Sequence, residues 1–234
     1  MALAALPSGA DKRIAVRKMF ERIAPRYDVL NRLFTFGLDQ RWRRHALEAV
    51  AVGAGDLVVD VATGTGDLAE LAAARGARVI GIDYTRAMLR GAILRGLRAS
   101  FVQADAERIP LPDGAASVVT CGFALRNFVS LDVPLREMAR VLAPGGRLAL
   151  LEVDVPSSAF VRLAHGIYFE RIVPRLGALL SDRAAYAYLP RSVSYLPARD
   201  ALLARVRDAG FERTAHSRLL LGTAQLVIAS KAGG

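Results

Sequence analysis

Three aspartates end short apolar runs of the sequence. Asp60 follows LVV, Asp83 ends RVIGID and Asp105 ends SFVQAD. Carboxylates accept hydrogen bonds from hydroxyl and amino groups and attract positive charge. If the runs are parallel strands, their carboxyl ends meet at one edge of a sheet, where ligands of open α/β sheets bind. The spacing therefore predicts a binding crevice with three acidic side chains.

A turn of small residues follows the first run. It reads Gly64-Thr65-Gly66 and continues with Asp67-Leu68-Ala69. The pattern G-x-G-x-x-A is typical of a dinucleotide-binding turn, with an acid about 20 residues further on that accepts from the ribose. Asp83 stands at that distance, so NAD binding is one hypothesis.

A cationic ligand explains the three acids better than a dinucleotide does. Asp60 is expected to face the glycine turn, where a carboxylate is unfavourable beside a pyrophosphate but suits an ammonium or sulfonium charge. Asp83 would then accept from ribose hydroxyls, and Asp105 with Ala106 would form an edge for an adenine amino group. Together they favour S-adenosylmethionine. The alternative, that each acid merely caps a helix, is reasonable for any one acid but less so for three at successive strand ends.

The elements around these residues alternate between strand and helix. We expect strands at 57–62, 78–83, 100–105, 116–124 and 147–154, with helices at 66–76, 86–96 and 130–146 between them. After a helix at 201–211, two strands at 212–221 and 224–231 follow without a helix between them, so they must pair antiparallel. The order predicts a Rossmann-like α/β fold. Its seven-stranded sheet is mostly parallel with one antiparallel strand, and helices cover both faces.

Two helical segments interrupt this alternation. Residues 11–52 lack strand-like runs, so we expect an N-terminal helical cap at 1–52 and a ligand-binding domain at 53–234. Within that domain, residues 157–197 are predicted to form a helical lid. Apolar side chains and arginines alternate there, which fits either a helix packed on the sheet or an apolar entrance beside lipid headgroups.

The composition of the chain limits the kinds of partner that the protein is expected to bind. The net charge is +10, and only Lys12, Lys18 and Lys231 are lysines. This charge is explained either by an anionic partner or by a bias toward arginine. It is spread along the chain without an aromatic and basic platform, so we expect no nucleic acid. No apolar run is long enough to span a bilayer.

These limits give further expectations. No two histidines have metal-ligand spacing, and Cys121 is the only cysteine, so we predict no metal. We expect a cytoplasmic protein, and we leave open peripheral contact with the inner face of a membrane and a homodimer.

Four blocks of the sequence resemble one known family. YDVLNRLFTFGLDQRW (27–42) and RVLAPGGRLALLEVD (140–154) resemble the two signatures of the ubiquinone/menaquinone biosynthesis C-methyltransferases. FALRNF (123–128) and YAYLPRS (186–192) resemble two further blocks of that family. The resemblance implies a class I methyltransferase that moves a methyl group from S-adenosylmethionine to a ring carbon of a polyprenylated quinol, demethylmenaquinol being the first guess. It places cofactor contacts on Thr65, Asp83, Asp105 and Ala106, and a family serine falls on Gly122.

Several positions depart from the family pattern. Leu30, Thr35 and Asp39 replace a methionine, a serine and a histidine of the first signature, and His165 replaces a tyrosine of the lid. Another small aromatic or polyketide-like acceptor is therefore the alternative substrate.

Carbon methylation of a quinol needs a phenolate and a proton acceptor. Arg126 and Asn127 follow the fourth strand, so we expect Arg126 to stabilise the phenolate or orient a water, and Asn127 to fix its geometry. The alternative for Arg126 is a surface salt bridge. Asp28, beside Tyr27, is a candidate base, and the alternative is a helix-packing hydrogen bond. The quinol is expected to contact three further residues, Asn31, His165 and Tyr168.

Overall fold

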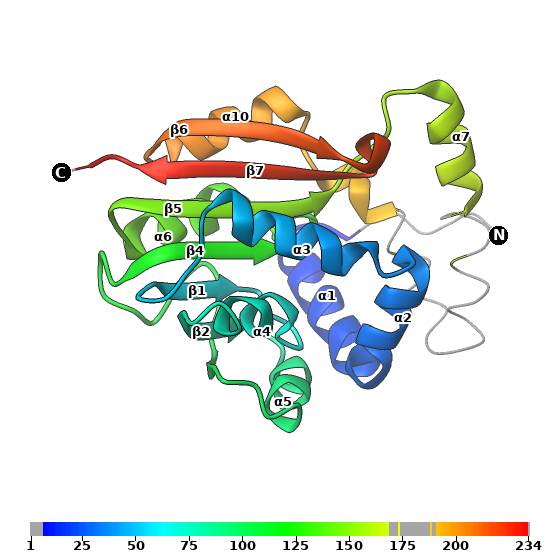
Figure 1. Cartoon of the computed structure of the whole chain (residues 1–234). Helices are drawn as coiled ribbons and strands as arrows, with labels where there is room; N and C mark the ends of the chain where they lie inside the picture. Colours follow the sequence, from blue (N-terminus) through cyan, green and yellow to red (C-terminus); the bar gives the residue numbers. More distant parts are fainter. Residues whose placement is uncertain (1–6, 169–172, 174–187, 189–190, 234) are drawn as a thin grey trace.

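A computed structural model describes residues 7–168, 173, 188 and 191–233, and within them the chain forms one seven-stranded sheet (Figure 1). The strand order across the sheet is β3-β2-β1-β4-β5-β7-β6. The strands are β1 (Leu57–Val61), β2 (Arg78–Asp83), β3 (Ser100–Gln103), β4 (Ala116–Gly122), β5 (Leu142–Val153), β6 (Phe211–Leu219) and β7 (Ala224–Lys231).

The pairing confirms the predicted mixed sheet. β1 to β5 pair in parallel, whereas β7 is antiparallel to both β5 and β6. The reversed strand therefore lies between β5 and β6. The short turn η5 (Leu220–Gly222) links β6 directly to β7, which leaves no length for the crossover helix that a parallel connection needs.

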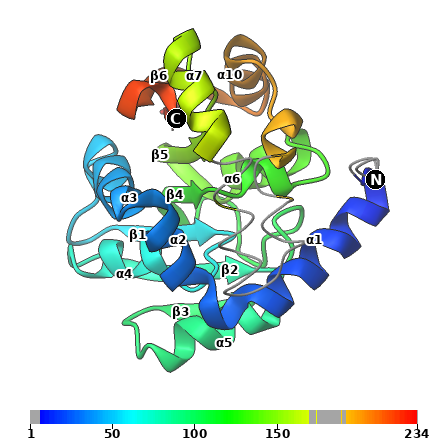
Figure 2. The ribbon, with the colours of Figure 1, turned by 90° about the vertical axis from the view of Figure 1, so that its right-hand side faces the viewer.

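Helices cover both faces of the sheet (Figure 2). On one face, α3 (Leu38–Ala49) and α4 (Asp67–Ala73) pack over a core that contains Leu47, Ala69 and Leu151. On the other, α6 (Asp132–Val141) and α10 (Arg199–Asp208) pack over a core that contains Leu135, Val206 and Leu150. α5 (Arg86–Leu94) lies by the β3 edge.

The largest error among the predicted boundaries lies between α6 and β5. The helix expected over 130–146 ends at Val141, and β5 begins at Leu142, five residues before the strand that we expected at 147. Pro144 cannot continue a helix, but the extended backbone tolerates it at an irregular site. The β4–β5 register shifts between Ala116 and Val118, which accommodates the extra residues as a bulge.

The N-terminal helices lie at the carboxyl ends of the parallel strands, the side that faces the viewer in Figure 2. They are α1 (Gly9–Ile23), the short turn η1 (Ala24–Arg26) and α2 (Tyr27–Thr35). Met19 and Ile23 of α1 pack with Phe34 of α2 and Met88 of α5. The same side carries α7 (Ala159–Ile167) and η4 (Val193–Tyr195), but much of the lid predicted at 157–197 falls outside the described residues. None of the described helices has the length and apolar character needed to cross a bilayer.

Asp60 joins β1, β4 and the glycine turn from inside the protein. Its side chain is 1% exposed, Thr120 of β4 donates a hydrogen bond to Oδ1 (2.7 Å), and Thr63 donates one to Oδ2 (2.6 Å). Burial raises the pKa of Asp60 to about 6, although the two hydroxyls oppose this shift. The protonation of the Asp60 carboxyl group is therefore linked to the stability of the fold.

This pKa gives a stability prediction. Protonated Asp60 contributes stability that is fully present below the unfolded-state value of 3.8 and is lost as the pH rises through about 6. Relative to Asp60→Asn, which does not titrate, the wild-type free energy of unfolding should fall by about 2 kcal/mol between about pH 4 and about pH 7. Urea titrations across this range measure the difference.

The matched control is Asp200→Asn, because the side chain of Asp200 is 84% exposed. Its free energy of unfolding should stay within about 0.5 kcal/mol of wild type, as is usual for exposed substitutions. A difference between Asp60→Asn and wild type that does not change with pH would contradict the buried titration.

Candidate active site

A cavity opens at the carboxyl ends of β1, β2, β3 and β4. Its empty volume is about 900 Å³, with the solvent at its open mouth included. Its described lining is Arg13, Val16, Arg17, Phe20, Tyr27, Ala62, Gly64, Ile82, Asp83, Tyr84, Thr85, Met88, Ala104, Asp105, Ala106, Glu107, Gly122, Phe123, Ala124, Asn127, Phe128 and Val129.

Asp83 is fixed in the wall of this cavity by two backbone groups. The Gly64 N–H donates to Oδ2 (2.8 Å) and the Thr85 N–H donates to Oδ1 (2.7 Å). Burial raises the pKa of Asp83, and these two hydrogen bonds oppose the shift. Each oxygen keeps a further lone pair, so the carboxylate can accept two hydroxyl groups of a ligand.

Asp105 and Ala106 lie in the loop after β3, also in the lining. The Glu107 N–H donates to Asp105 Oδ1 (3.0 Å), and Arg13 Nη1 donates to Oδ2 (2.9 Å). Arg13 Nη2 also reaches Glu107 Oε2 (2.6 Å). A helix far away in the sequence thus closes over this loop.

Three predicted cofactor contacts lie outside the lining. Both oxygens of Asp60 face Thr63 and Thr120, and we revise its role from ligand contact to support of the turn. Gly66, with φ 88°, precedes α4, and its conformation favours glycine. The Thr65 hydroxyl donates to Asp28 instead of facing the cavity.

Gly122 lines the cavity and packs closely against the tip of the Leu68 side chain. A Cβ at this position would lie 2.7 Å from Leu68 Cδ1. The hydroxyl that the family serine would bring is therefore excluded here unless Leu68 moves.

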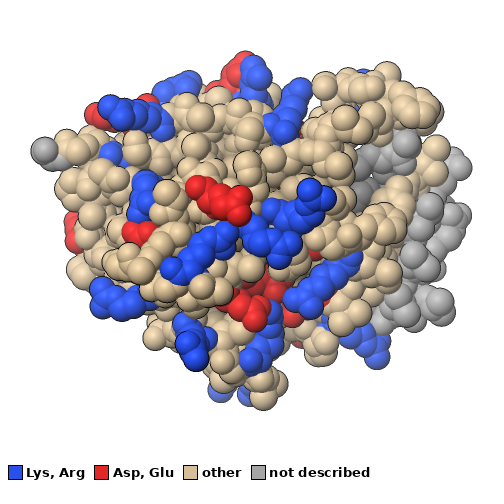
Figure 3. Space-filling model, viewed as in Figure 1, with Lys and Arg blue, Asp and Glu red and all other residues tan. Residues whose placement is uncertain are grey.

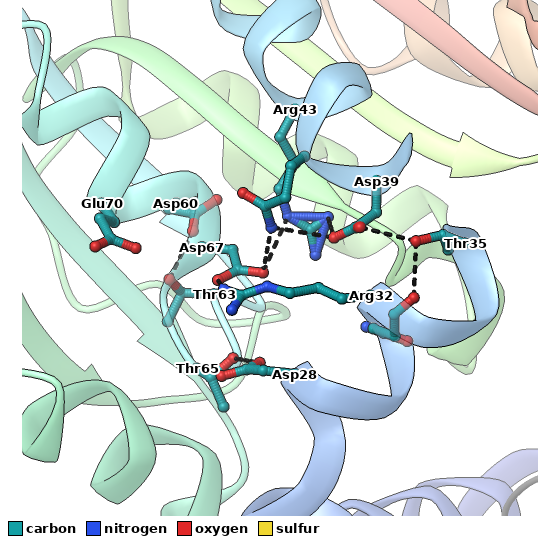
Figure 4. A network of polar contacts seen from close by, with 12 residues as sticks. Asp28, Arg32, Thr35, Asp39, Arg43, Asp60, Thr63, Thr65, Asp67 and Glu70 are labelled. Atoms are coloured by element: carbon teal, nitrogen blue, oxygen red, sulfur yellow. Dashed lines mark hydrogen bonds and ion pairs between the residues drawn. The ribbon is translucent and has the colours of Figure 1, made fainter. Parts of the chain in front are cut away.

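Asp67 is the centre of a polar network that links the cap to the glycine turn (Figure 4). Its oxygens accept from Arg95 of the α5 end (2.8 Å) and Gln40 of α3 (2.9 Å). Arg32 of α2 lies 3.5 Å away and Arg43 of α3 lies 3.7 Å away. Burial alone raises the pKa of Asp67, but Arg43 and Arg95 bring it below the ordinary value. The carboxylate therefore stays charged.

Asp28 belongs to the same network. It accepts from Thr65 and lies 3.5 Å from Arg95, and Figure 4 shows it facing the turn. Burial raises its pKa, and the Thr65 hydroxyl opposes this. Its oxygens lie outside the cavity lining, so we no longer assign it the part of base. The helix-packing hydrogen bond is the interpretation that this geometry supports.

Arg126 is held by a buried acid. Its Nη1 donates to Glu152 and to the Phe123 carbonyl (2.8 Å), and its backbone N–H donates to Glu152 Oε2 (3.2 Å). Arg126 is 7% exposed and Glu152 0%, so the surface salt bridge considered from the sequence is wrong. Its Nε has no hydrogen-bond partner among the described residues.

Two polar side chains near Arg126 belong to the lining of the cavity. Asn127 and Tyr27 line it, and the Tyr188 hydroxyl donates to Asn127 Oδ1 (3.2 Å). Burial raises the pKa of Tyr27, and it raises that of Tyr188 to about 12. Both hydroxyls therefore stay protonated and able to donate. The positive charge of Arg126 is close enough to act on both.

The residues predicted to contact the acceptor lie around α2. The side chain of Asn31 hydrogen-bonds Tyr27. The Tyr168 hydroxyl donates to the Phe34 carbonyl (3.1 Å), and its ring lies 5.7 Å from that of Phe36. Neither is part of the described lining. His165 is in α7, but its side chain falls outside the described part of the chain.

Sequence reasoning missed three groups. Glu152 ends a buried strand, as Asp83 does, so the rule that identified the aspartates also identifies this acid. Tyr188 is within YAYLPRS, which was recognised but given no role. The contacts of Arg13 and its neighbours on α1 connect positions about 90 residues apart and have no local sequence signal.

The chain is similar to known methyltransferases over nearly its whole length. A sequence model described as the ubiE/COQ5 methyltransferase family matches residues 8–231. A demethylmenaquinone methyltransferase from Thermus thermophilus is 48% identical over 82% of this chain and 91% of that protein. A ubiquinone/menaquinone biosynthesis C-methyltransferase from Syntrophotalea carbinolica is 41% identical over 90% of this chain and 91% of its own.

A solved structure supports the fold. Phosphoethanolamine N-methyltransferase 2 of Haemonchus contortus, in complex with S-adenosyl-L-methionine, aligns with a TM-score of 0.60 at 13% identity, over 81% of this chain and 52% of that one. At this identity the likeness concerns the fold alone. The family match and the two relatives carry the assignment: the chain belongs to the ubiE/COQ5 methyltransferase family.

Proposed function

We propose that this protein transfers a methyl group from S-adenosylmethionine to a ring carbon of a lipophilic quinol, with demethylmenaquinol as the first substrate. The observation that carries the proposal is the full-length match to a family whose relatives are named for this reaction, together with the acid-lined cavity at the strand ends. The alternative acceptor, another small aromatic compound, is an outcome of the test below.

The cavity walls suit the parts of S-adenosylmethionine. Asp83 would accept from the ribose hydroxyls, Asp105 with Ala106 would meet the adenine amino group, and the turn at Gly64 would approach the methionine portion. Two non-glycine residues of the lining have positive φ, Ala62 (55°) and Phe123 (60°). Such backbone strain is concentrated at binding and catalytic sites, which supports this placement.

The reaction needs charge control at the phenol of the acceptor. Loss of the phenol proton makes the neighbouring ring carbon nucleophilic, and this carbon displaces S-adenosylhomocysteine from the methyl group in line. The same carbon then loses its hydrogen as a proton, which restores the aromatic ring. We assign the phenolate to the space beside Tyr27 and Asn127, where the hydroxyl of Tyr27 and the amide group of Asn127 are the nearest donors.

Arg126 would supply the positive charge behind these donors. Glu152 holds its Nη1, and because Arg126 itself is not among the residues that line the cavity, we assign the Nε without a described partner to a bound water. A buried donor without a partner costs about 1–3 kcal/mol, so such an atom is retained where it serves a function. A water held there is our candidate for the proton acceptor.

We propose that the protein binds its quinol substrate at a membrane surface. At the carboxyl ends of the strands, Phe36 is 77% exposed, Phe160 of α7 80% and Leu221 of η5 73%. Arg162 is exposed two residues after Phe160 in α7. Exposed apolar side chains with a nearby arginine suit shallow insertion among anionic headgroups. The protein would then work from the cytoplasm at the inner face of the membrane.

The double variant Arg126→Gln/Glu152→Gln tests the catalytic proposal. Removing both charges avoids leaving one buried and unpaired, which costs about 3–5 kcal/mol. We expect wild type to place labelled methyl on the ring of reduced demethylmenaquinone in detergent. The double variant should lose roughly 10²–10³-fold in kcat while S-adenosylmethionine still binds.

The control is Arg199→Gln, since Arg199 is exposed on α10. Wild-type turnover by the double variant would remove Arg126 from the mechanism. If wild type labels a different aromatic compound and not the quinol, the alternative acceptor replaces our first choice.

The membrane proposal has its own prediction. Phe160→Glu combined with Leu221→Glu should weaken binding to phosphatidylglycerol vesicles at least tenfold, because two apolar side chains no longer insert. Cosedimentation measures this. Leu94→Glu is the matched control, because Leu94 is 87% exposed on α5 near the other edge of the sheet. Equal vesicle binding by the double variant and wild type would reject this surface.

A further inference from the structure

Helix α1 forms one wall of the cavity. Arg13, Val16, Arg17 and Phe20 line it from α1, and the strand-end loops line it from the opposite side. Figure 2 shows α1 crossing the carboxyl ends of the strands. A ligand in this cavity would therefore lie between α1 and the loops.

Three cations of α1 fasten it to three different loops. Lys12 Nζ donates to the Phe128 carbonyl (2.6 Å) after β4. Arg13 pairs with Asp105 and Glu107 after β3. The guanidinium of Arg17 lies 5.0 Å from the ring centroid of Tyr84, directly after β2. These contacts connect α1 to the loops that hold all the proposed cofactor acceptors.

The Arg13 contact differs from the Lys12 contact in exposure. Lys12 is 4% exposed, so its contact belongs to the protein interior. The Arg13 side chain is 39% exposed, and those of Asp105 and Glu107 are 31% and 29% exposed. Solvent and salt reach these pairs, so they can break and re-form without unfolding α1.

Arg13 also fixes the side chain of Asp105, the acid that we assign to the adenine amino group. Asp105 Oδ2 bonds Arg13 and Oδ1 bonds the Glu107 N–H, so the carboxylate has one orientation. Because Arg13 bridges two carboxylates, it neutralises charge that would otherwise repel between Asp105 and Glu107. Its loss would free the loop after β3, while Lys12 and Arg17 still hold α1 to the other two loops.

We propose that Arg13 is a positioning residue for the cofactor: it orients Asp105 toward the adenine amino group and latches α1 over the bound nucleoside. Cofactor exchange then requires that the Arg13 pairs with Asp105 and Glu107 open. This inference rests on the proposed function, because it takes the cavity to hold S-adenosylmethionine and its product.

The experiment measures release of S-adenosylhomocysteine by stopped-flow fluorescence. Trp42 is the only tryptophan, and its ring lies 6.3 Å from that of Phe123, which lines the cavity. Arg13→Gln should speed release about fivefold, as expected from the loss of two partly exposed ion pairs. Wild-type release should also accelerate when sodium chloride rises from about 0.05 M to about 0.5 M, and the variant should lose this dependence.

Two further variants separate the latch from a folding defect. Glu107→Gln removes the Arg13–Glu107 ion pair and leaves the Arg13–Asp105 pair. It should also speed release of S-adenosylhomocysteine, but by less than Arg13→Gln does. Arg13→Lys keeps the charge without the two-pronged geometry and should restore part of the salt dependence. Arg199→Gln, exposed on α10, should match wild type.

The outcomes distinguish the inference from the function beneath it. If wild type binds S-adenosylhomocysteine but Arg13→Gln releases it at the wild-type rate with the same salt dependence, the latch is wrong and the cavity assignment stands. If wild type does not bind S-adenosylhomocysteine at all, the proposed function and the latch both fail.

Discussion

The buried carboxylate of Asp67 is the interaction on which the rest of the site depends. Three arginines and Gln40 converge on it from α2, α3 and the end of α5. Asp67 follows directly after Gly66, so this network fixes the glycine turn and the helical cap at once. The glycine turn also contains the Gly64 N–H, which donates a hydrogen bond to Asp83 and orients its carboxylate. The ligand cavity thus depends on a charge that never contacts the ligand.

The same kind of pairing accounts for several of the arginines, although the net charge of +10 is what remains after all acids are counted against the bases. Figure 3 shows basic side chains over the face covered by α3 and α4, with acidic ones among them. Arg43, Arg95, Arg126 and Arg147 all pair with acids within the fold. Guanidinium groups suit this use because they make several directed hydrogen bonds while staying charged. These four arginines therefore serve internal pairing, whereas the net charge of +10 comes from the basic residues in excess of the acids.

The sequence predicted the parts that depend on local pattern. The strand end at Asp83 was found because apolar runs and acids alternate with helical segments, whereas the strand predicted to end at Asp105 ends at Gln103 and leaves Asp105 in the loop. Asp60 was placed too far forward: it precedes Ala62 by two residues, which is about 7 Å along a strand, and its side chain lies below the cavity. Packing of α1 over the loops, and the Arg126–Glu152 pair, join distant segments. No periodicity encodes such contacts.

The most direct test of the account is calorimetric titration of S-adenosylmethionine into wild type and Asp83→Asn, with NADH titrated in parallel. The account predicts one binding site in wild type, affinity at least tenfold weaker in Asp83→Asn because one acceptor becomes a donor, and no NADH binding. Binding of NADH without S-adenosylmethionine would return the cavity to the dinucleotide hypothesis. Equal affinity in wild type and Asp83→Asn would place the cofactor elsewhere.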